Sequence, residues 1–160
     1  MFGDEGNRKK RRFSDEKKHN IDLFLNFVKQ GFNKGNLDAL NEICAPDYKE
    51  SQSSFTPPNL EGLKNGIRAI HAAYSHFYVE VLDITADGDQ VWARSRAMGI
   101  HTGSFSGWPV TGRRFRIQVI DICRFENGLM KEHWGMSDQM ALYRQLGAWV
   151  MPPQAPRRHE

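Results

Sequence analysis

A single carboxylate lies on an otherwise apolar face of the strand expected at residues 114–125. Side chains alternate between the two faces of a strand, so the odd-numbered positions share one face: Phe115, Ile117, Val119, Asp121, Cys123 and Phe125. A buried carboxylate is unfavourable unless it is paired, hydrogen-bonded or protonated. Held in a cavity, it can act as a general acid or base. Asp121 is therefore the first candidate for proton transfer. The alternative is a purely structural Asp121, whose carboxylate is hydrogen-bonded to a backbone amide or paired with an arginine.

The residue that faces Asp121 depends on the turn at residues 126–128, in the segment ENGLMKEHW. A two-residue turn would pair Asp121 with Trp134 and would set two basic side chains opposite each other. A three-residue loop with Gly128 in the left-handed conformation pairs Asp121 with His133 instead. The second register avoids the like-charge pair, so we expect an Asp121–His133 couple.

Four further side chains are candidates for the site. Asp138 follows Ser137 at an expected helix N-terminus, where a negative charge is favourable; it is a second catalytic candidate beside this structural role. Trp108 lies in a glycine-rich connection, where it could contact a substrate. Trp134 and His71 could also contact a substrate. The alternative for Trp134 is an aromatic residue packed in its strand, and the alternative for His71 is a core histidine on the apolar face of its helix.

The sequence contains none of the common metal or nucleotide motifs. Its six histidines include no H-x-x-x-H pair, and Cys44 and Cys123 are too far apart for a metal-type or redox-type pair. A P-loop, a Rossmann glycine pattern and a nucleophile elbow are also absent. We therefore expect no metal and no cofactor. Two isolated cysteines are typical of a reducing setting, which predicts a cytoplasmic location.

Charge is concentrated at the ends of the chain. The 160 residues carry a net charge of +3, but residues 8–12 are five consecutive basic residues, and the body is close to neutral. Such a run can bind nucleic acid; we favour a solvated arm and expect no nucleic-acid partner. The expected organisation is a disordered basic arm (1–13), one domain (14–150) and a flexible tail (151–160). No stretch is apolar enough to span a membrane, so no membrane partner is expected.

Hydrophobic periodicity predicts helices first and strands afterwards. The expected helices begin at an N-cap at Ser14, at Asn36 (a short helix that includes Cys44), at residue 60 and, after a cap at Ser137, near the C-terminus; the expected strands are 79–84, 91–100, 113–125 and 129–134. This order indicates an α+β fold, with a curved antiparallel sheet and helices on one face. Ile120, Ile122 and Trp134 would leave an apolar patch on the outer face, which predicts a homodimer.

Four segments resemble one known family: FNKGNLDALNEICAPDY, GIHTGSFSGWPVTGRRF, VIDICRFENGLMKEHW and RQLG. From about residue 20 to 147 the chain is similar to the SnoaL-like polyketide cyclases, a branch of the NTF2-like superfamily. The resemblance implies a cone-shaped α+β barrel, in which a strongly bent sheet wraps around helices and encloses an apolar cavity. Cyclases of this family close a ring of a polyketide ester by an intramolecular aldol reaction, without metal or organic cofactor. Their relatives include isomerases, dehydratases and hydrolases.

The resemblance also marks two departures. The aspartate that serves as acid/base in the aromatic polyketide cyclases falls on Gly135, and their nearby histidine falls on Asp121. Two functions follow as hypotheses. The first is a cofactor-independent enzyme that transfers protons on a small hydrophobic carbonyl compound, through Asp121 with His133. The second is a non-catalytic module that binds a small hydrophobic molecule.

Overall fold

The computed structural model describes residues 4–104 and 107–147, with side chains from residue 14 onward. Its elements, in chain order, are α1 (Asp4–Phe27), the π-helix η1 (Val28–Asn33), α2 (Leu40–Ile43), β1 (Cys44–Glu50), α3 (Leu60–Ala73), β2 (Tyr74–Asp87), β3 (Gln90–His101), β4 (Arg114–Glu126), β5 (Leu129–Ser137) and α4 (Gln139–Leu146). Among these residues no helix combines the length and apolarity needed to cross a membrane.

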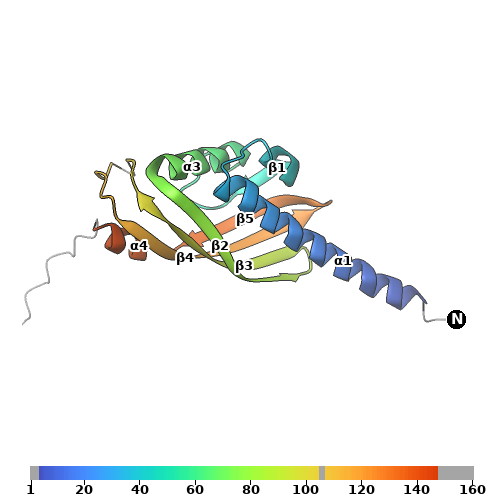
Figure 1. The fold of residues 1–160 in the computed structure, drawn as a ribbon. Helices are drawn as coiled ribbons and strands as arrows, with labels where there is room; N and C mark the ends of the chain where they lie inside the picture. The colour runs from blue at the N-terminus through green and yellow to red at the C-terminus, as the bar shows by residue number, and fades with distance from the viewer. Residues whose placement is uncertain (1–3, 105–106, 148–160) are drawn as a thin grey trace, which may run out of the picture.

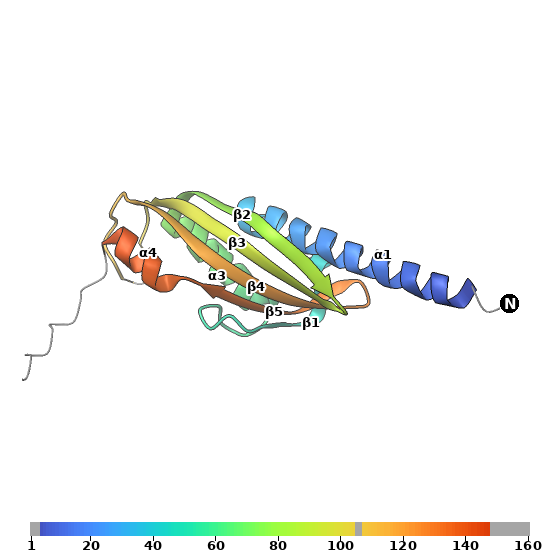
Figure 2. The ribbon, with the colours of Figure 1, turned by 90° about the horizontal axis from the view of Figure 1, so that it is seen from below.

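The five strands form one curved sheet in the order β1-β5-β4-β3-β2 (Figure 1). β2 to β5 are antiparallel neighbours, whereas β1 lies parallel to β5 at the edge. Helices α1 and α3 lie on the same side of the sheet, so that the view from below shows the strands in front of α3 (Figure 2). The α+β prediction is confirmed, with the qualification that the sheet is bent but not closed into a barrel.

The core lies between the helices and the inner face of the sheet. Phe24 and Phe27 of α1 and Leu63 and Ile67 of α3 are almost completely buried against it. Burial of each such side chain contributes roughly 1.5–3 kcal/mol. The π-helical turn that continues α1 is fixed to the edge of the sheet, because the Asn33 side chain exchanges two hydrogen bonds with the backbone of Val79. The helices are therefore fixed in place over the inner face of the sheet and form one wall of the space between them.

Two of the predicted element boundaries are wrong. Cys44 is the first residue of β1 and not part of a helix; the helix ends at Ile43. Pro46 does not prevent this strand, because proline is tolerated on an edge strand. The helix α1 begins at Asp4, well before the predicted N-cap at Ser14, so its backbone is helical through most of the segment expected to be a disordered arm (Figure 1).

The last helix also begins differently. Its N-cap is Asp138, whose carboxylate accepts the backbone N–H of Ala141 at 2.9 Å, and not Ser137. Gly147 ends the helix in the left-handed conformation, as expected. The domain boundaries at residues 13 and 150 stay predictions, and the predicted tail of residues 151–160 lies outside the described residues.

Candidate functional site

The alternation predicted for β4 is confirmed by burial. Asp121 is 8% exposed and lies on the inner face between Val119, which is partly buried, and Cys123, which is buried, whereas Ile120 on the outer face is 43% exposed. The strand therefore presents one carboxylate to the space beneath the helices. Its burial is the first requirement for an unusual chemical role.

The register between β4 and β5 differs from both predicted alternatives. Asn127 and Gly128 have φ angles of 51° and 76°, as expected of a two-residue hairpin turn that needs positive φ at both central positions. The pairing then shifts by one residue between Phe125 and Arg124. As a result Asp121 lies directly opposite Gly135, and the predicted pairings with Trp134 and with His133 are both wrong.

The register shift is a β-bulge that changes which charges meet. Lys131 is the additional residue on β5, so Arg124 faces Glu132 and not a second basic residue. The guanidinium Nε of Arg124 donates to Glu132 Oε2 at 2.8 Å. Lys131 forms an ion pair with Asp47 of β1. The bulge thus removes the like-charge pair that the two-residue turn alone would produce.

The expected Asp121–His133 couple is present in spite of the different register. The two residues are diagonal neighbours on the inner face, and His133 Nε2 lies 3.1 Å from Asp121 Oδ1. His133 is completely buried. The ring of Phe27 lies against the imidazole, with the ring centroids 5.7 Å apart. The imidazole therefore has one polar neighbour on β4 and an apolar neighbour on α1.

A second carboxylate, which sequence reasoning missed, binds the other side of His133. Glu50 lies opposite His133 in the parallel pair of β1 and β5. It is 2% exposed, and its two oxygens lie 3.1 and 3.0 Å from His133 Nδ1. Tyr48 donates its hydroxyl to Glu50 Oε2 at 2.7 Å, and the backbone N–H of Gln52 donates to Oε1 at 2.8 Å. Tyr48 and Glu50 are two residues apart and therefore share one face of a strand. This spacing was the one feature of the sequence that could have indicated a buried Glu50.

The two carboxylates determine the protonation of His133. Burial lowers the pKa of His133, but hydrogen bonds to Asp121 and Glu50, together with their negative charges, raise it to about 9. At neutral pH the imidazole therefore carries both protons and donates one to each carboxylate. Burial and the nearby Glu50 raise the pKa of Tyr48, so its hydroxyl remains a donor.

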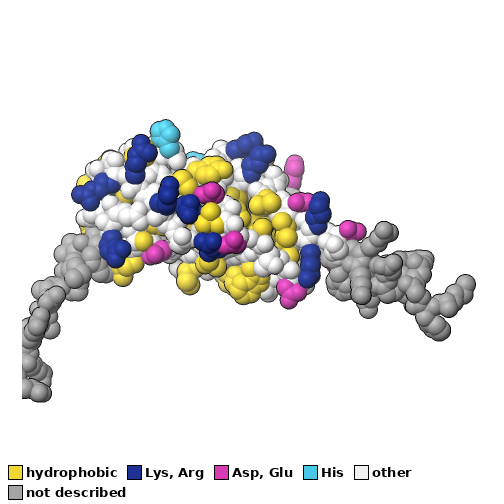
Figure 3. Space-filling model, turned by 60° about the horizontal axis from the view of Figure 1, so that its bottom comes forward, with side chains coloured by type: hydrophobic (Ala, Val, Ile, Leu, Met, Phe, Trp, Pro, Cys, Tyr) yellow, Lys and Arg dark blue, Asp and Glu magenta, His cyan; other side chains and the backbone are white. Residues whose placement is uncertain are grey.

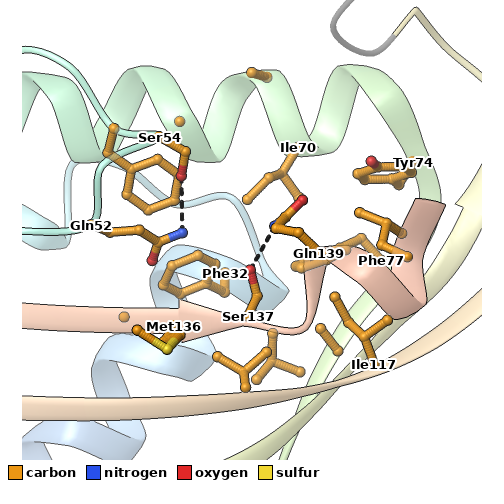
Figure 4. Close-up of a pocket in the computed structure, with 18 of the residues that line it drawn as sticks. Phe32, Gln52, Ser54, Ile70, Tyr74, Phe77, Ile117, Met136, Ser137 and Gln139 are labelled. Carbon is orange, nitrogen blue, oxygen red and sulfur yellow. Dashed lines mark hydrogen bonds between the residues drawn. The ribbon is translucent and has the colours of Figure 1, made fainter. Parts of the chain in front are cut away.

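Asp121 borders a pocket of about 830 Å³ between the sheet and the helices. Most of the lining is aromatic or aliphatic, as Phe32, Ile70, Phe77 and Ile117 illustrate in Figure 4. Among the described residues, Asp121 is the only lining residue of the Asp, Glu, Lys, Arg or His type. A bound molecule would therefore meet one charged group in apolar surroundings.

Two hydrogen-bonded pairs of uncharged polar side chains border this pocket (Figure 4). Gln52 Nε2 donates to Ser54 Oγ at 3.1 Å, and Gln139 Nε2 donates to Ser137 Oγ at 2.6 Å. The Gln52 side chain lies over Gly135, where any Cβ would clash with its Oε1 atom. The absence of a side chain at position 135, directly opposite Asp121, thus leaves room for the Gln52 side chain.

The other predicted site residues lie elsewhere. Asp138 is exposed and caps α4, Trp134 is on the outer face of the sheet, and His71 is an exposed residue whose Nε2 lies 2.8 Å from the carbonyl oxygen of Phe32. Trp108 borders a separate, smaller pocket of about 180 Å³ beside Tyr143. None of the four lines the pocket at Asp121. Within the described residues, no cluster of three His, Cys, Asp or Glu side chains could hold a metal ion.

Comparisons with known proteins agree with this architecture. Aklanonic acid methyl ester cyclase DauD of Streptomyces sp. (strain C5) is 29% identical over 152 residues, covering 88% of this chain and 94% of DauD. The nogalonic acid methyl ester cyclase of Streptomyces nogalater is 30% identical over 125 residues, covering 72% of this chain and 89% of that protein. The structure of TsrD from Streptomyces laurentii matches with a TM-score of 0.75 at 30% identity, covering 82% of this chain and 97% of TsrD.

A bent, unclosed sheet with helices on one face defines an α+β protein with the NTF2-like fold. The model of the SnoaL-like polyketide cyclases matches residues 22–146, which is most of the chain. The protein belongs to the SnoaL-like polyketide cyclase family.

Proposed function

We propose that this protein is a cofactor-independent enzyme that transfers a proton on a small hydrophobic carbonyl compound, with Asp121 as the acid/base. The observation that carries the proposal is the position of Asp121: it is the one charged side chain, among the described residues, that lines an otherwise apolar pocket. In such surroundings a carboxylate can act as a general base toward a bound molecule and, once protonated, as a general acid. His133 fixes the orientation of this carboxylate through a hydrogen bond between its Nε2 and Asp121 Oδ1.

The reaction that fits best is closure of a ring by an intramolecular aldol addition. Two relatives are named as the cyclases of aklanonic acid methyl ester and of nogalonic acid methyl ester. In this reaction Asp121 removes a proton from the carbon next to the ester carbonyl and forms an enolate. The enolate carbon attacks a ketone carbonyl of the same molecule, a carbon–carbon bond forms, and the resulting alkoxide takes a proton from Asp121. Substrate and product are isomers, so no co-reactant is needed.

The departure at Gly135 is compatible with this chemistry. The resemblance to aromatic polyketide cyclases places their acid/base aspartate at this position of β5. Gly135 lies directly opposite Asp121, and opposed residues of antiparallel strands have Cα atoms only about 4.5–5.5 Å apart. Asp121 can therefore supply a carboxylate from the neighbouring strand to much the same part of the pocket.

The alternative function is non-catalytic binding of a small hydrophobic molecule. One observation favours it: both ring nitrogens of His133 are already bound by carboxylates, as in a network that serves structure alone. In that case the pocket binds a ligand and Asp121 exchanges no proton with it. The two functions differ in whether a bound ester loses its acidic proton to the protein.

The experiment uses aklanonic acid methyl ester as the probe, incubated with the protein in D₂O. We expect deuterium at the carbon next to the ester carbonyl, detected by NMR, and a cyclised product with the mass of the substrate. Binding is measured separately by titration calorimetry. Binding without deuterium incorporation or cyclisation would support the alternative function and contradict the enzymatic one for this ester.

We also propose that two copies of the chain pair through the outer face of the sheet. Two neighbouring rows across β3, β4 and β5 carry exposed apolar side chains: Trp92, Ile120, Trp134 and Met136. Figure 3 shows hydrophobic side chains on this face among Lys, Arg and acidic residues. Ion pairs such as Arg96–Glu80 lie on the same sheet. An apolar centre with charged surroundings is the usual composition of an interface.

A further inference from the structure

Glu50 is completely buried, does not line the pocket, and still connects three parts of the site. Its carboxylate accepts hydrogen bonds from Tyr48 Oη, from the Gln52 backbone and from His133 Nδ1. Gln52 places its side chain over Gly135, and His133 holds Asp121. One carboxylate thus binds His133, which contacts Asp121, and Gln52, which lies over the residue opposite Asp121.

The geometry points to Glu50 as a positioning residue for the proposed proton transfer: it fixes the orientation of His133, and through it Asp121, while it anchors the backbone of Gln52, whose side chain lies over Gly135. This inference rests on the proposed function for its catalytic consequence. Its structural part concerns His133 alone and can be measured without a substrate.

The orientation of the imidazole follows from its contacts on three sides. Glu50 binds Nδ1 from β1, and the ring of Phe27 packs against the imidazole from α1. Nε2 is then directed at Asp121 Oδ1. Within the described residues no hydrogen bond engages Oδ2 of Asp121, so this oxygen is available to a molecule in the pocket. Without Glu50 the imidazole could rotate or exchange its tautomer, and Asp121 would lose a fixed donor.

The two carboxylates that act on His133 come from two strands, and further titratable groups lie near them. Tyr48, Cys44 and Glu50 lie on β1, and Asp121 and Cys123 lie on β4; Lys64 of α3 acts on Cys44. Burial raises the pKa of Cys44 to about 12 and raises that of Cys123, so both thiols stay neutral. The two carboxylates are therefore the charges that hold the second proton on His133.

The test is ¹⁵N NMR of the His133 ring in the full chain during a pH titration, in wild type and Glu50→Gln. The wild-type ring should keep both protons well above neutral pH. In Glu50→Gln we expect its titration midpoint to fall by about one pH unit or more, because one carboxylate no longer opposes desolvation. The control is Glu42→Gln, which makes the same chemical change at an exposed residue of α2; its midpoint should equal that of wild type.

Glu50→Asp keeps the charge and provides the answer if the glutamine variant does not fold. Its side chain is one carbon shorter, so its carboxylate should no longer reach His133 Nδ1 as Glu50 does, and the His133 midpoint should fall below that of wild type. An unchanged midpoint in folded Glu50→Gln, or an unchanged ring in Glu50→Asp when Glu50→Gln is unfolded, would overturn the inference.

The catalytic consequence is measured with the deuterium-exchange probe. We expect Glu50→Gln to lower kcat by about tenfold or more with little change in KM, because Glu50 does not line the pocket. Equal loss in kcat and gain in KM would contradict a positioning role. If wild type itself exchanges no deuterium, the proposed function fails, while the NMR titration still decides the role of Glu50 toward His133.

Discussion

Raising the pH should destabilise the fold through the buried imidazole of His133. Its pKa is raised from an ordinary value of 6.5 to about 9 in the folded protein, because the hydrogen bonds and charges of Asp121 and Glu50 outweigh desolvation. A raised pKa means that the folded state binds the proton more tightly than the unfolded state. The stabilisation is therefore fully present below about pH 6.5 and is lost as the pH rises through about 9.

The size of this effect follows from the difference between the two pKa values. At about 1.4 kcal/mol for each pH unit, the difference between 6.5 and about 9 corresponds to about 3 kcal/mol. Total stabilities of domains are about 5–15 kcal/mol, so the loss should be easy to measure. Urea unfolding, followed by circular dichroism at several pH values across this window, gives the free energy of unfolding at each pH.

The matched control is His19→Gln, which removes an exposed imidazole that contacts the carbonyl of Gly128. It should show the same decline with pH as wild type. In His133→Gln the decline should be absent, since no proton is bound at that position. A wild-type free energy of unfolding that stays constant across this window would refute the doubly protonated imidazole, and with it the description of the buried network.

Three further predictions concern the pocket, the surface and the N-terminal segment. Gly135→Ala should destabilise the protein by about 1 kcal/mol or less, and less again in a Gln52→Ala background, because its Cβ meets Gln52 Oε1, the end of a flexible side chain that can move away; equal costs in thermal melts of both backgrounds would contradict the clash. Ile120→Lys should convert a sedimenting dimer to monomer without unfolding it, and a monomeric wild type at micromolar concentration would refute the interface. Deleting residues 1–13 should leave the melting temperature almost unchanged, because the buried apolar pattern begins later in α1; a large decrease would place the domain boundary earlier.

Local patterns in the sequence predicted the inner face of the central strand correctly. The alternation of residues 114–125 depends only on the geometry of one strand, and Asp121 is buried where that geometry places it. The glycine at 147 that ends α4 has a similarly local cause, the left-handed conformation that follows a helix. These features need no knowledge of distant residues.

The features that were missed depend on contacts between distant segments. β1 pairs in parallel with β5, more than 80 residues away, as the Glu50–His133 contact shows. The sequence of this segment predicts instead a short helix that includes Cys44 and ends before Pro46. The bulge that moves Asp121 opposite Gly135 coincides with an ion pair between Lys131 and Asp47 of β1. The sequence of the hairpin alone contains no sign of that partner, so neither predicted register was the observed one.

The most direct test of the account compares Asp121→Asn with Asp138→Asn in the deuterium-exchange assay with aklanonic acid methyl ester. Asparagine keeps the shape of each side chain, and it remains a good N-cap at position 138, so both variants should fold and bind the ester. We predict that Asp121→Asn abolishes deuterium incorporation and cyclisation, whereas Asp138→Asn retains both. Exchange that persists in Asp121→Asn, or that disappears only in Asp138→Asn, would contradict the assignment of Asp121 as the acid/base.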